Sequence, residues 1–195
     1  MILCDYKIKE AIEKGELVVT PAPVASQYDS TALNLRVGDD FRKWREALKA
    51  PGFDGSIDLD HVHLSELLPL TEPVEVVNGI VTIAPGDFVL VRSLERVSFP
   101  LKSKLAARVE GRSTLARLGF SVHITAPTIH AGFDGRITLE ILNHGPFAIK
   151  LRPNQSEICQ LIIECVKGIP KRQVQTRFLG QSTPLGTPKG KTPRK

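Results

Sequence analysis

The chain of 195 residues is long enough for one sizeable core, and 42% hydrophobic with 24% charged residues is ordinary for a soluble globular protein. The formal net charge of +5 does not by itself indicate a nucleic-acid-binding protein, because the positive charge is concentrated at one end. Residues 167–195 carry eight Lys or Arg and no acid, which leaves 18 basic against 21 acidic residues upstream, a net charge of −3.

Cysteine content and hydropathy indicate the cellular compartment of the protein. Cys4, Cys159 and Cys165 are an odd and sparse set without a disulfide framework, which fits a reducing environment. No apolar run approaches the length of a membrane span, and the first ten residues hold four charged side chains. We therefore expect neither membrane insertion nor secretion, and a cytoplasmic location.

The pattern along the chain predicts one short helix followed by many short strands. Asp5 can cap a helix with Ile8, Ala11 and Ile12 on one face and Gly15 at its end. Alternating or apolar runs between turn formers then predict strands at residues 33–37, 56–60, 74–77, 80–83, 88–92, 105–109, 121–125, 136–142, 147–151 and 157–166.

Two regions between these strands carry their own predictions. Asn78-Gly79 is the strongest hairpin signal in the chain, and residues 41–50 with Trp44 are expected to form a second short helix or an insertion packed on the strands. Many short strands at this spacing predict a mainly β protein, a sandwich or a barrel. Because the apolar pattern stops at Lys167, we expect a domain at residues 1–166 and a basic tail or lid at residues 167–195.

One segment combines phosphate donors with a strand carboxylate. Residues 111–119 read Gly-Arg-Ser-Thr-Leu-Ala-Arg-Leu-Gly, in which Ser113 and Thr114 can cap a short helix that Gly119 ends. The free N–H groups of its first turn, with Arg112 beside them, would face a phosphate. Glu140 follows on a predicted strand. Taken alone, the run also fits a plain capped helix, and Glu140 an outward strand residue.

The neighbouring residues carry a resemblance. Together with Val122-His123-Ile124-Thr125-Ala126, the run resembles the active-site segment of the dCTP deaminase family, part of the trimeric dUTPase superfamily. Similarities at residues 1–5, 33–38, 143, 151–153 and 160–161 extend it over nearly the whole chain up to Val166. The resemblance implies a dUTPase-like distorted β-barrel or jelly roll with a few short helices, and a homotrimer whose active sites form between subunits.

The family implies hydrolytic deamination of dCTP to dUTP and ammonia. In that reading Glu140 is the general base, Ser113 holds the water or the leaving amine, and Arg117 balances charge around the ring. The further implied substrate contacts are Arg112, Thr114, Leu115 and Ala116 for the triphosphate with Mg²⁺ spread over its oxygens, Ile124, Ala126, Thr138 and Leu139 for the cytosine, His130 for the sugar, and Arg177 and Gln181 for closure.

No zinc is expected, because the chain lacks the signature of the zinc-dependent cytidine deaminases, in which His or Cys and Pro-Cys-x-x-Cys hold the metal. Cys159 and Cys165 are separated by five residues, and His61-Val62-His63 has no further ligand nearby in the sequence, whereas a metal site needs three or four ligands. His123 fits a core histidine or a pocket residue equally, and Arg136 is expected to pair with Asp134.

The sequence departs from the family pattern at one site position. Where relatives carry an Ile-Asp run, this chain has Ile129-His130, which lacks the carboxylate that orients water at the α-phosphate in dUTPases. The imidazole can still bond the 3′-hydroxyl. This change and Thr125-Ala126-Pro127, where bifunctional relatives often read Thr-Ala-Gly, favour a simple deaminase over a bifunctional enzyme that forms dUMP.

The tail departs from the family as well. Residues 177–181, Arg-Phe-Leu-Gly-Gln, resemble the Lys-Tyr-x-x-Gln lid of the family, with arginine and phenylalanine in place of lysine and tyrosine. Arg177 keeps a positive charge for the phosphates, and Gln181 keeps its amide. A nucleotide sensor or a nucleic-acid-binding module on the same fold is the alternative class. The tail lacks the interleaved aromatic residues of a single-strand binder, and a sensor has no use for Glu140, so both are disfavoured. Feedback by dTTP stays open.

Overall fold

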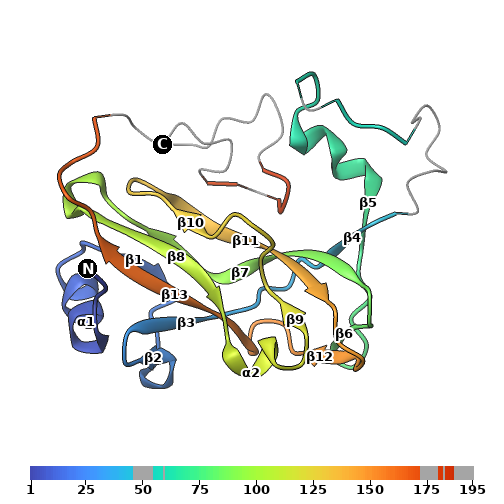
Figure 1. Cartoon of the computed structure of the whole chain (residues 1–195), viewed down its shortest axis with the longest axis horizontal. Helices are drawn as coiled ribbons and strands as arrows, with labels where there is room; N and C mark the ends of the chain where they lie inside the picture. Colours follow the sequence, from blue (N-terminus) through green and yellow to red (C-terminus); the bar gives the residue numbers. More distant parts are fainter. Residues whose placement is uncertain (46–54, 59, 172–179, 182, 187–195) are drawn as a thin grey trace.

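Two antiparallel β-sheets share one hydrophobic core in this computed structural model (Figure 1), which describes residues 1–45, 55–58, 60–171, 180–181 and 183–186. The first sheet has the order β5 (Thr71–Pro73), β4 (Arg42–Trp44), β7 (Phe88–Ser98), β11 (Asp134–Asn143), β9 (Phe120–Ser121), and β1 (Val18–Thr20) also pairs with β7. The second sheet has the order β10 (Thr128–Ile129), β8 (Leu105–Gly111), β13 (Glu157–Cys165), β3 (Ala32–Arg36), β2 (Tyr28–Asp29).

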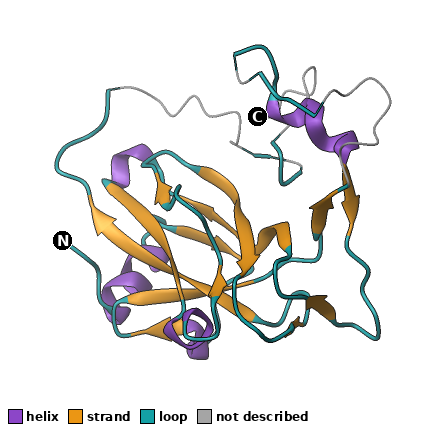
Figure 2. Ribbon diagram, turned by 45° about the vertical axis from the view of Figure 1, so that its right-hand side comes forward, coloured by secondary structure: helices purple, strands orange, loops and turns teal. Residues whose placement is uncertain are grey.

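The helices are short and lie around the strands (Figure 2). They are α1 (Asp5–Glu13), η1 (Ala25–Gln27), η3 (Leu64–Leu70), η4 (Leu101–Ser103) and α2 (Ser113–Ala116), and a small third sheet joins β6 (Val81–Ile83) to β12 (Ile149–Leu151). The expected mainly β fold is confirmed. Within the described residues, the hydrogen-bonded order of the strands does not close into a barrel.

Strand alternation directs one set of side chains of the first sheet into the main core and the other set to the opposite face of the sheet. In β11 the odd-numbered residues 135–143 are buried, whereas the even-numbered ones lie on the opposite face. Leu139 and Ile141 therefore enter the main core with Val89 and Val91 of β7. Leu90 points the other way, into a small cluster with Leu67 and Leu185. The outward face of β11 and β7 is thus covered by η3 and the C-terminal segment.

Several predicted elements take a different form. Residues 42–44, expected in a second short helix or in an insertion packed on the strands, form a strand, because β4 pairs with β5 and with Leu90 of β7. Residues 46–50 of that prediction lie outside the described residues. The Asn78-Gly79 turn is confirmed with φ of 51° and 73°, but it closes a single bridge between Val77 and Ile80. No strand forms at the described residues of 56–60 or at residues 74–76.

Other boundaries shift in ways that contacts explain. Of the predicted strand 121–125 only Ser121 lies in a strand, β9. The strand β10 was not predicted, because it is two residues long and is held by pairing with β8. The N-terminal helix is confirmed and Gly15 ends it with φ of 68°, but Asp5 lies in the first turn and Cys4 at the cap makes no side-chain bond. Among the described residues, no helix is long and apolar enough to cross a membrane.

Candidate active site

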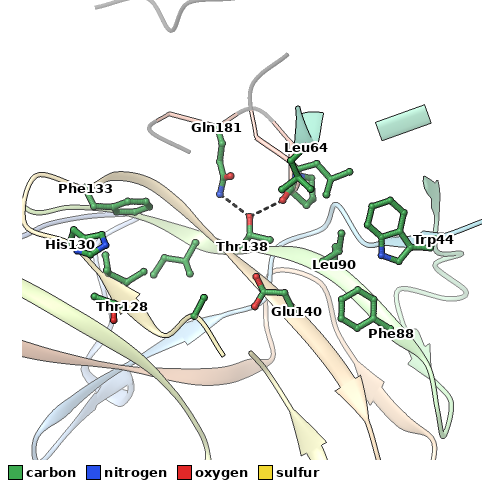
Figure 3. Close-up of a pocket in the computed structure, with 15 residues that line it drawn as sticks. Trp44, Leu64, Phe88, Leu90, Thr128, His130, Phe133, Thr138, Glu140 and Gln181 are labelled. Carbon is green, nitrogen blue, oxygen red and sulfur yellow. Dashed lines mark hydrogen bonds between the residues drawn. The ribbon is translucent and has the colours of Figure 1, made fainter. Parts of the chain in front are cut away.

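A pocket of about 500 Å³ opens on the outward face of β7 and β11 (Figure 3). It combines polar groups of β10 and β11 with apolar groups of β4, η3 and β7, and the C-terminal segment forms one wall. Its lining includes Trp44, Leu64, Phe88, Leu90, Ala126, Thr128, His130, Phe133, Thr138, Glu140, Gln181, Pro184 and Leu185.

Glu140 is the acidic residue of this pocket, and its surroundings favour proton exchange. Burial raises the pKa of the Glu140 carboxyl above its ordinary value, while backbone N–H groups, including that of Ile124, and the nearby His123 partly oppose the shift. The Nδ1 atom of His123 is buried without a hydrogen-bond partner in the structure. A carboxyl with a raised pKa can take a proton and return it near neutral pH. His123, for which the sequence left a core role and a pocket role open, is half-buried near the Glu140 carboxylate and is not among the residues that line the pocket.

The C-terminal residues 180–181 and 183–186 dock on β11 beside Glu140. The Gln181 side-chain amide donates to the Thr138 hydroxyl (2.8 Å) and to the Arg136 carbonyl (2.9 Å), and Thr138 donates to the Pro184 carbonyl (3.2 Å). The backbone N–H of Gly180 donates to the Asp134 carbonyl (2.9 Å). Gln181 is thus a fixed wall of the pocket, as Figure 3 shows. Arg177 lies outside the described residues.

Arg92 anchors the same segment from β7. Its guanidinium donates to the Gln181 carbonyl (3.1 Å) and contacts Asp40 (3.5 Å). Burial lowers the pKa of Arg92, and the charge of Asp40 opposes this change. The expected pairing of Arg136 with Asp134 is wrong, because the Asp134 carboxylate pairs with Arg96 at 2.6 Å. Arg96 is the cross-strand partner of Arg136, so it reaches the same carboxylate from the neighbouring strand.

The Gly-Arg-Ser-Thr run forms α2, away from this pocket. The N-cap is Arg112 and no side chain caps the helix, so the expected cap by Ser113 and Thr114 is wrong. The Arg112 guanidinium instead pairs with the Glu157 carboxylate at 2.8 Å. The side chains of residues 113, 114, 116 and 117 are exposed. Figure 1 shows α2 at the lower end of the sheets, opposite the docked C-terminal segment.

Two glycines fix α2 on the turn that follows β11. A Cβ atom on Gly119, whose φ is 80°, would lie 2.6 Å from the backbone nitrogen of Gly145, and a Cβ on Gly145 would overlap the Leu118 carbonyl oxygen. The backbone N–H of His144 donates to the Gly119 carbonyl (2.8 Å). Asn143, fully buried, holds the turn by accepting from the Gly145 N–H and donating to the Phe147 carbonyl. Side chains at either glycine would displace α2 from the end of the strand that carries Glu140.

The structure brings together some of the expected site residues and separates others. Ala126, His130, Thr138, Glu140 and Gln181 line one pocket. The residues placed elsewhere are Arg112, Ser113, Thr114, Leu115, Ala116 and Arg117 on or beside α2, Ile124 at an exposed position, and Leu139 with its side chain in the main core.

The apolar lining was missed by sequence reasoning. Leu64, Phe88, Leu90 and Leu185 come from segments distant in the sequence, and no local motif marks them. Phe88 and Leu90 could have been found from strand alternation, since they share one face of the strand predicted at residues 88–92.

The cysteines and the His61-Val62-His63 pair were weighed as metal ligands from the sequence. His61 contacts Asp58 (2.8 Å) and His63 contacts Ser65 (2.6 Å). All three cysteines are free, and burial raises the pKa of Cys159 to about 12, which keeps it a neutral thiol. The described residues contain no group of three or more His, Cys, Asp or Glu that could hold a metal ion.

Known proteins are similar to this chain in sequence and in fold. Residues 2–166 match the sequence model of a family described as dCTP deaminase-like. Among curated relatives, a "dCTP deaminase, dUMP-forming" of Methanobrevibacter smithii is 34% identical over 94% of this chain and 92% of its own length. A "dCTP deaminase" of Pasteurella multocida is 34% identical over 91% and 90%.

Among solved structures, the 2'-deoxycytidine 5'-triphosphate deaminase of Agrobacterium tumefaciens aligns with a TM-score of 0.63 and 20% identity. The alignment covers 84% of this chain and 48% of that one, so this likeness concerns the fold, and the present chain spans about half of that protein. The family model and the relatives that match over nearly their full length are sufficient for the assignment. The chain belongs to the dCTP deaminase-like family.

Proposed function

We propose that this protein is a cytoplasmic, zinc-independent dCTP deaminase that converts dCTP and water into dUTP and ammonia. The observation that carries the proposal is Glu140: a carboxyl with a raised pKa in a pocket, on a chain that belongs to this family. Two relatives named as deaminases match over about nine tenths of this chain or more. The proposed pathway role is supply of dUTP for deoxynucleotide synthesis.

The chemistry requires an activated water at C4 of the cytosine and a proton for the departing amine. Glu140 takes a proton from the attacking water, which bonds to C4, and later gives a proton to the amino group as the C4–N bond breaks. Ala126 and the backbone of Thr138 lie beside Glu140 and would shape the slot for the base. Ser113 would hold the water or the amine, and Arg117 would balance charge.

A single chain does not complete this arrangement, which supports a homotrimer. Ser113 and Arg117 are exposed on α2, and they do not line the pocket of Glu140 in the same subunit. A second copy would bring its α2 to the pocket and supply both side chains. The site would then form between subunits, which is the arrangement that the family resemblance implies.

The triphosphate would bind at α2. The first bond within this helix runs from the Ala116 N–H to the Arg112 carbonyl, so the N–H groups of residues 113–115 remain for phosphate oxygens. Arg112 and Thr114 flank them. Mg²⁺ would neutralise phosphate charge when bound, and it would be held through the triphosphate, because the described residues include no cluster of acids for a protein-bound ion.

The backbone contact of Gly119 with the turn at Gly145 predicts a specific loss. Gly119→Ala should misplace α2 and lower kcat/KM for dCTP by roughly tenfold to a hundredfold, since small misplacements in a site are costly. Gly86→Ala is the matched control, because Gly86 has a similar φ of 85° but open space around its Cβ position. Equal activities of the two variants per folded protein would contradict the role of this contact.

A bifunctional enzyme that continues from dCTP to dUMP is the second candidate, because relatives named "dUMP-forming" match at 34–35% identity. His130 is the residue on which the two candidates differ. It lines the pocket where the family pattern has a carboxylate, and an imidazole lacks the negative charge and the two acceptor oxygens with which that carboxylate orients water at the α-phosphate. The simple deaminase is therefore our proposal.

This argument predicts that pyrophosphate release from dUTP is much slower than ammonia release from dCTP. His130→Asp should increase pyrophosphate release from dUTP while deamination continues, since it restores the family carboxylate. Both products are measured in the same reactions, with Thr128→Ser as a conservative control in the same pocket. Matching rates of ammonia and pyrophosphate release by the unmodified protein would contradict the assignment.

The experiment that tests the whole proposal compares nucleotides and metals. The purified protein is incubated with dCTP, CTP or dUTP, with Mg²⁺ or with a chelator, and the products are separated. We expect ammonia and dUTP from dCTP with Mg²⁺, and full recovery of chelated protein by Mg²⁺ alone. A requirement for zinc, or no turnover of dCTP, would contradict the proposal. Addition of dTTP to the same reaction tests feedback inhibition.

A further inference from the structure

The pocket has an apolar end that the deamination of dCTP itself does not require. In Figure 3 the Glu140 carboxyl lies between two groups of side chains: Thr128, His130 and Phe133 on one side, and apolar side chains on the other. The apolar end consists of Trp44, Leu64, Phe88, Leu90 and Leu185. Its aliphatic and phenyl groups offer neither a donor nor an acceptor to the polar edge of a cytosine.

Strand pairing places this end directly beside Glu140. Leu90 of β7 is the cross-strand partner of Glu140, so the two side chains are neighbours on one face of the sheet. Phe88 lies two residues earlier on the same face of β7. Trp44 reaches the pocket from β4, which pairs with β7 at Leu90.

Leu185 of the C-terminal segment and residues of η3 form the remaining wall of the apolar end. Leu185 is 3% exposed and packs in one cluster with Leu67 and Leu90, against which Leu64 and Leu68 of η3 also pack. The segment that carries Leu185 is held by the hydrogen bonds of Gln181 described above. The end of the pocket is therefore a supported apolar surface beside the reacting centre.

The geometry of the cytosine ring determines which of its edges meets this surface. The following step rests on the proposed function, with Glu140 acting at C4 and the sugar at His130. N1, which carries the sugar, lies across the ring from C4, so the ring extends from His130 toward Glu140. C5 is bonded to C4, so its substituent projects beside the reacting carbon, and with C5 turned toward β7 this substituent meets Leu90 and Phe88.

We propose that this pocket takes cytosine deoxynucleotides with a small apolar substituent at C5, and that the protein deaminates 5-methyl-dCTP. Water oxygen bonds to C4, the C4–N bond breaks and the amino group leaves as ammonia, with the protons passing through Glu140. The product is dTTP, and water is the only co-reactant. Burial of the methyl group against the apolar end contributes up to roughly fourfold in kcat/KM.

The direct test compares dCTP with 5-methyl-dCTP on the full chain, by ammonia release and product separation. We expect 5-methyl-dCTP to be deaminated with a kcat/KM equal to that of dCTP or up to roughly fourfold higher. Turnover of dCTP together with a value for 5-methyl-dCTP a hundredfold lower overturns this inference and leaves the proposed function standing. Turnover of neither nucleotide overturns both.

A pair of variants in η3 locates the effect. Leu64→Phe adds volume to the apolar end, and we expect it to lower the ratio of the two kcat/KM values, 5-methyl-dCTP over dCTP, at least about fivefold. Leu68→Phe makes the same change in the same helix and cluster, but Leu68 does not line the pocket, so the ratio should stay unchanged. An equal ratio in Leu64→Phe, Leu68→Phe and the unmodified protein would overturn the placement of the methyl group.

Discussion

Glu140→Gln is expected to reduce dCTP deamination by roughly a hundredfold or more while nucleotide binding persists. The amide keeps the size of the side chain and its position opposite Leu90, but it cannot accept the proton of the attacking water. Single-turnover ammonia release measures the chemical step, and binding of dCTP measured separately shows that the pocket remains. Glu110→Gln is a control, since Glu110 is a strand residue of β8 outside the pocket. Near-normal turnover in Glu140→Gln would contradict the assignment of Glu140 as the general base.

The raised pKa of Glu140 adds a pH dependence with a definite sign. The folded protein holds this proton more tightly than the unfolded chain, so the cost of ionising a buried carboxyl is present above the folded pKa and relieved as the pH falls through it. Glu140→Gln removes that cost and should melt at a higher temperature than the unmodified protein at neutral pH, with the difference shrinking in acid. Activity has the opposite trend, because kcat/KM falls as the base becomes protonated.

How much of this site follows from sequence depends on how local each feature is. The motif predicts Glu140 as a site residue. The two-residue alternation of β11 predicts that its side chain points away from the main core. Glu140 is the outward strand residue that the alternation predicts, the face it lies on is covered into a pocket, and its role as general base stays a prediction. The cover itself comes from contacts between distant segments. Leu185 and Leu90 are 95 residues apart, and nothing local marks their packing.

The separation of α2 from Glu140 shows the same limit. The run at residues 111–119 and the strand of Glu140 are close in sequence, which suggested a single pocket. The chain instead turns at Gly119, whose backbone packs on Gly145 beyond the end of β11. Strand pairing then carries Glu140 to the opposite side of the sheet from the core, where Gln181 and η3 meet it. A local motif predicts the chemistry of each part, whereas the pairing of strands decides which parts of one subunit meet.

Deletion of the C-terminal residues from Arg177 onward is expected to leave a folded protein with kcat/KM for dCTP lower by roughly a hundredfold. The deletion removes the Gln181 bonds to Thr138 and to Arg136, and it exposes the cluster that Leu185 fills. A lid that excludes water and completes the site affects turnover and substrate affinity together. Both constants are therefore measured, along with the melting temperature and oligomeric state.

A shorter deletion separates the lid from the positive charge of the tail. Removal of residues 187–195 takes away four Lys or Arg but keeps the docked residues 180–181 and 183–186, so deamination should stay close to normal. Gln181→Glu tests the docking of this segment without a deletion, because a carboxylate cannot donate to the Thr138 hydroxyl or the Arg136 carbonyl. A nucleic-acid arm would give the reverse pattern, in which either deletion abolishes a salt-sensitive affinity for DNA or RNA and deamination persists. The lid reading requires the two deletions to differ, because only the longer one removes the hydrogen bonds that hold the wall of the pocket beside Glu140.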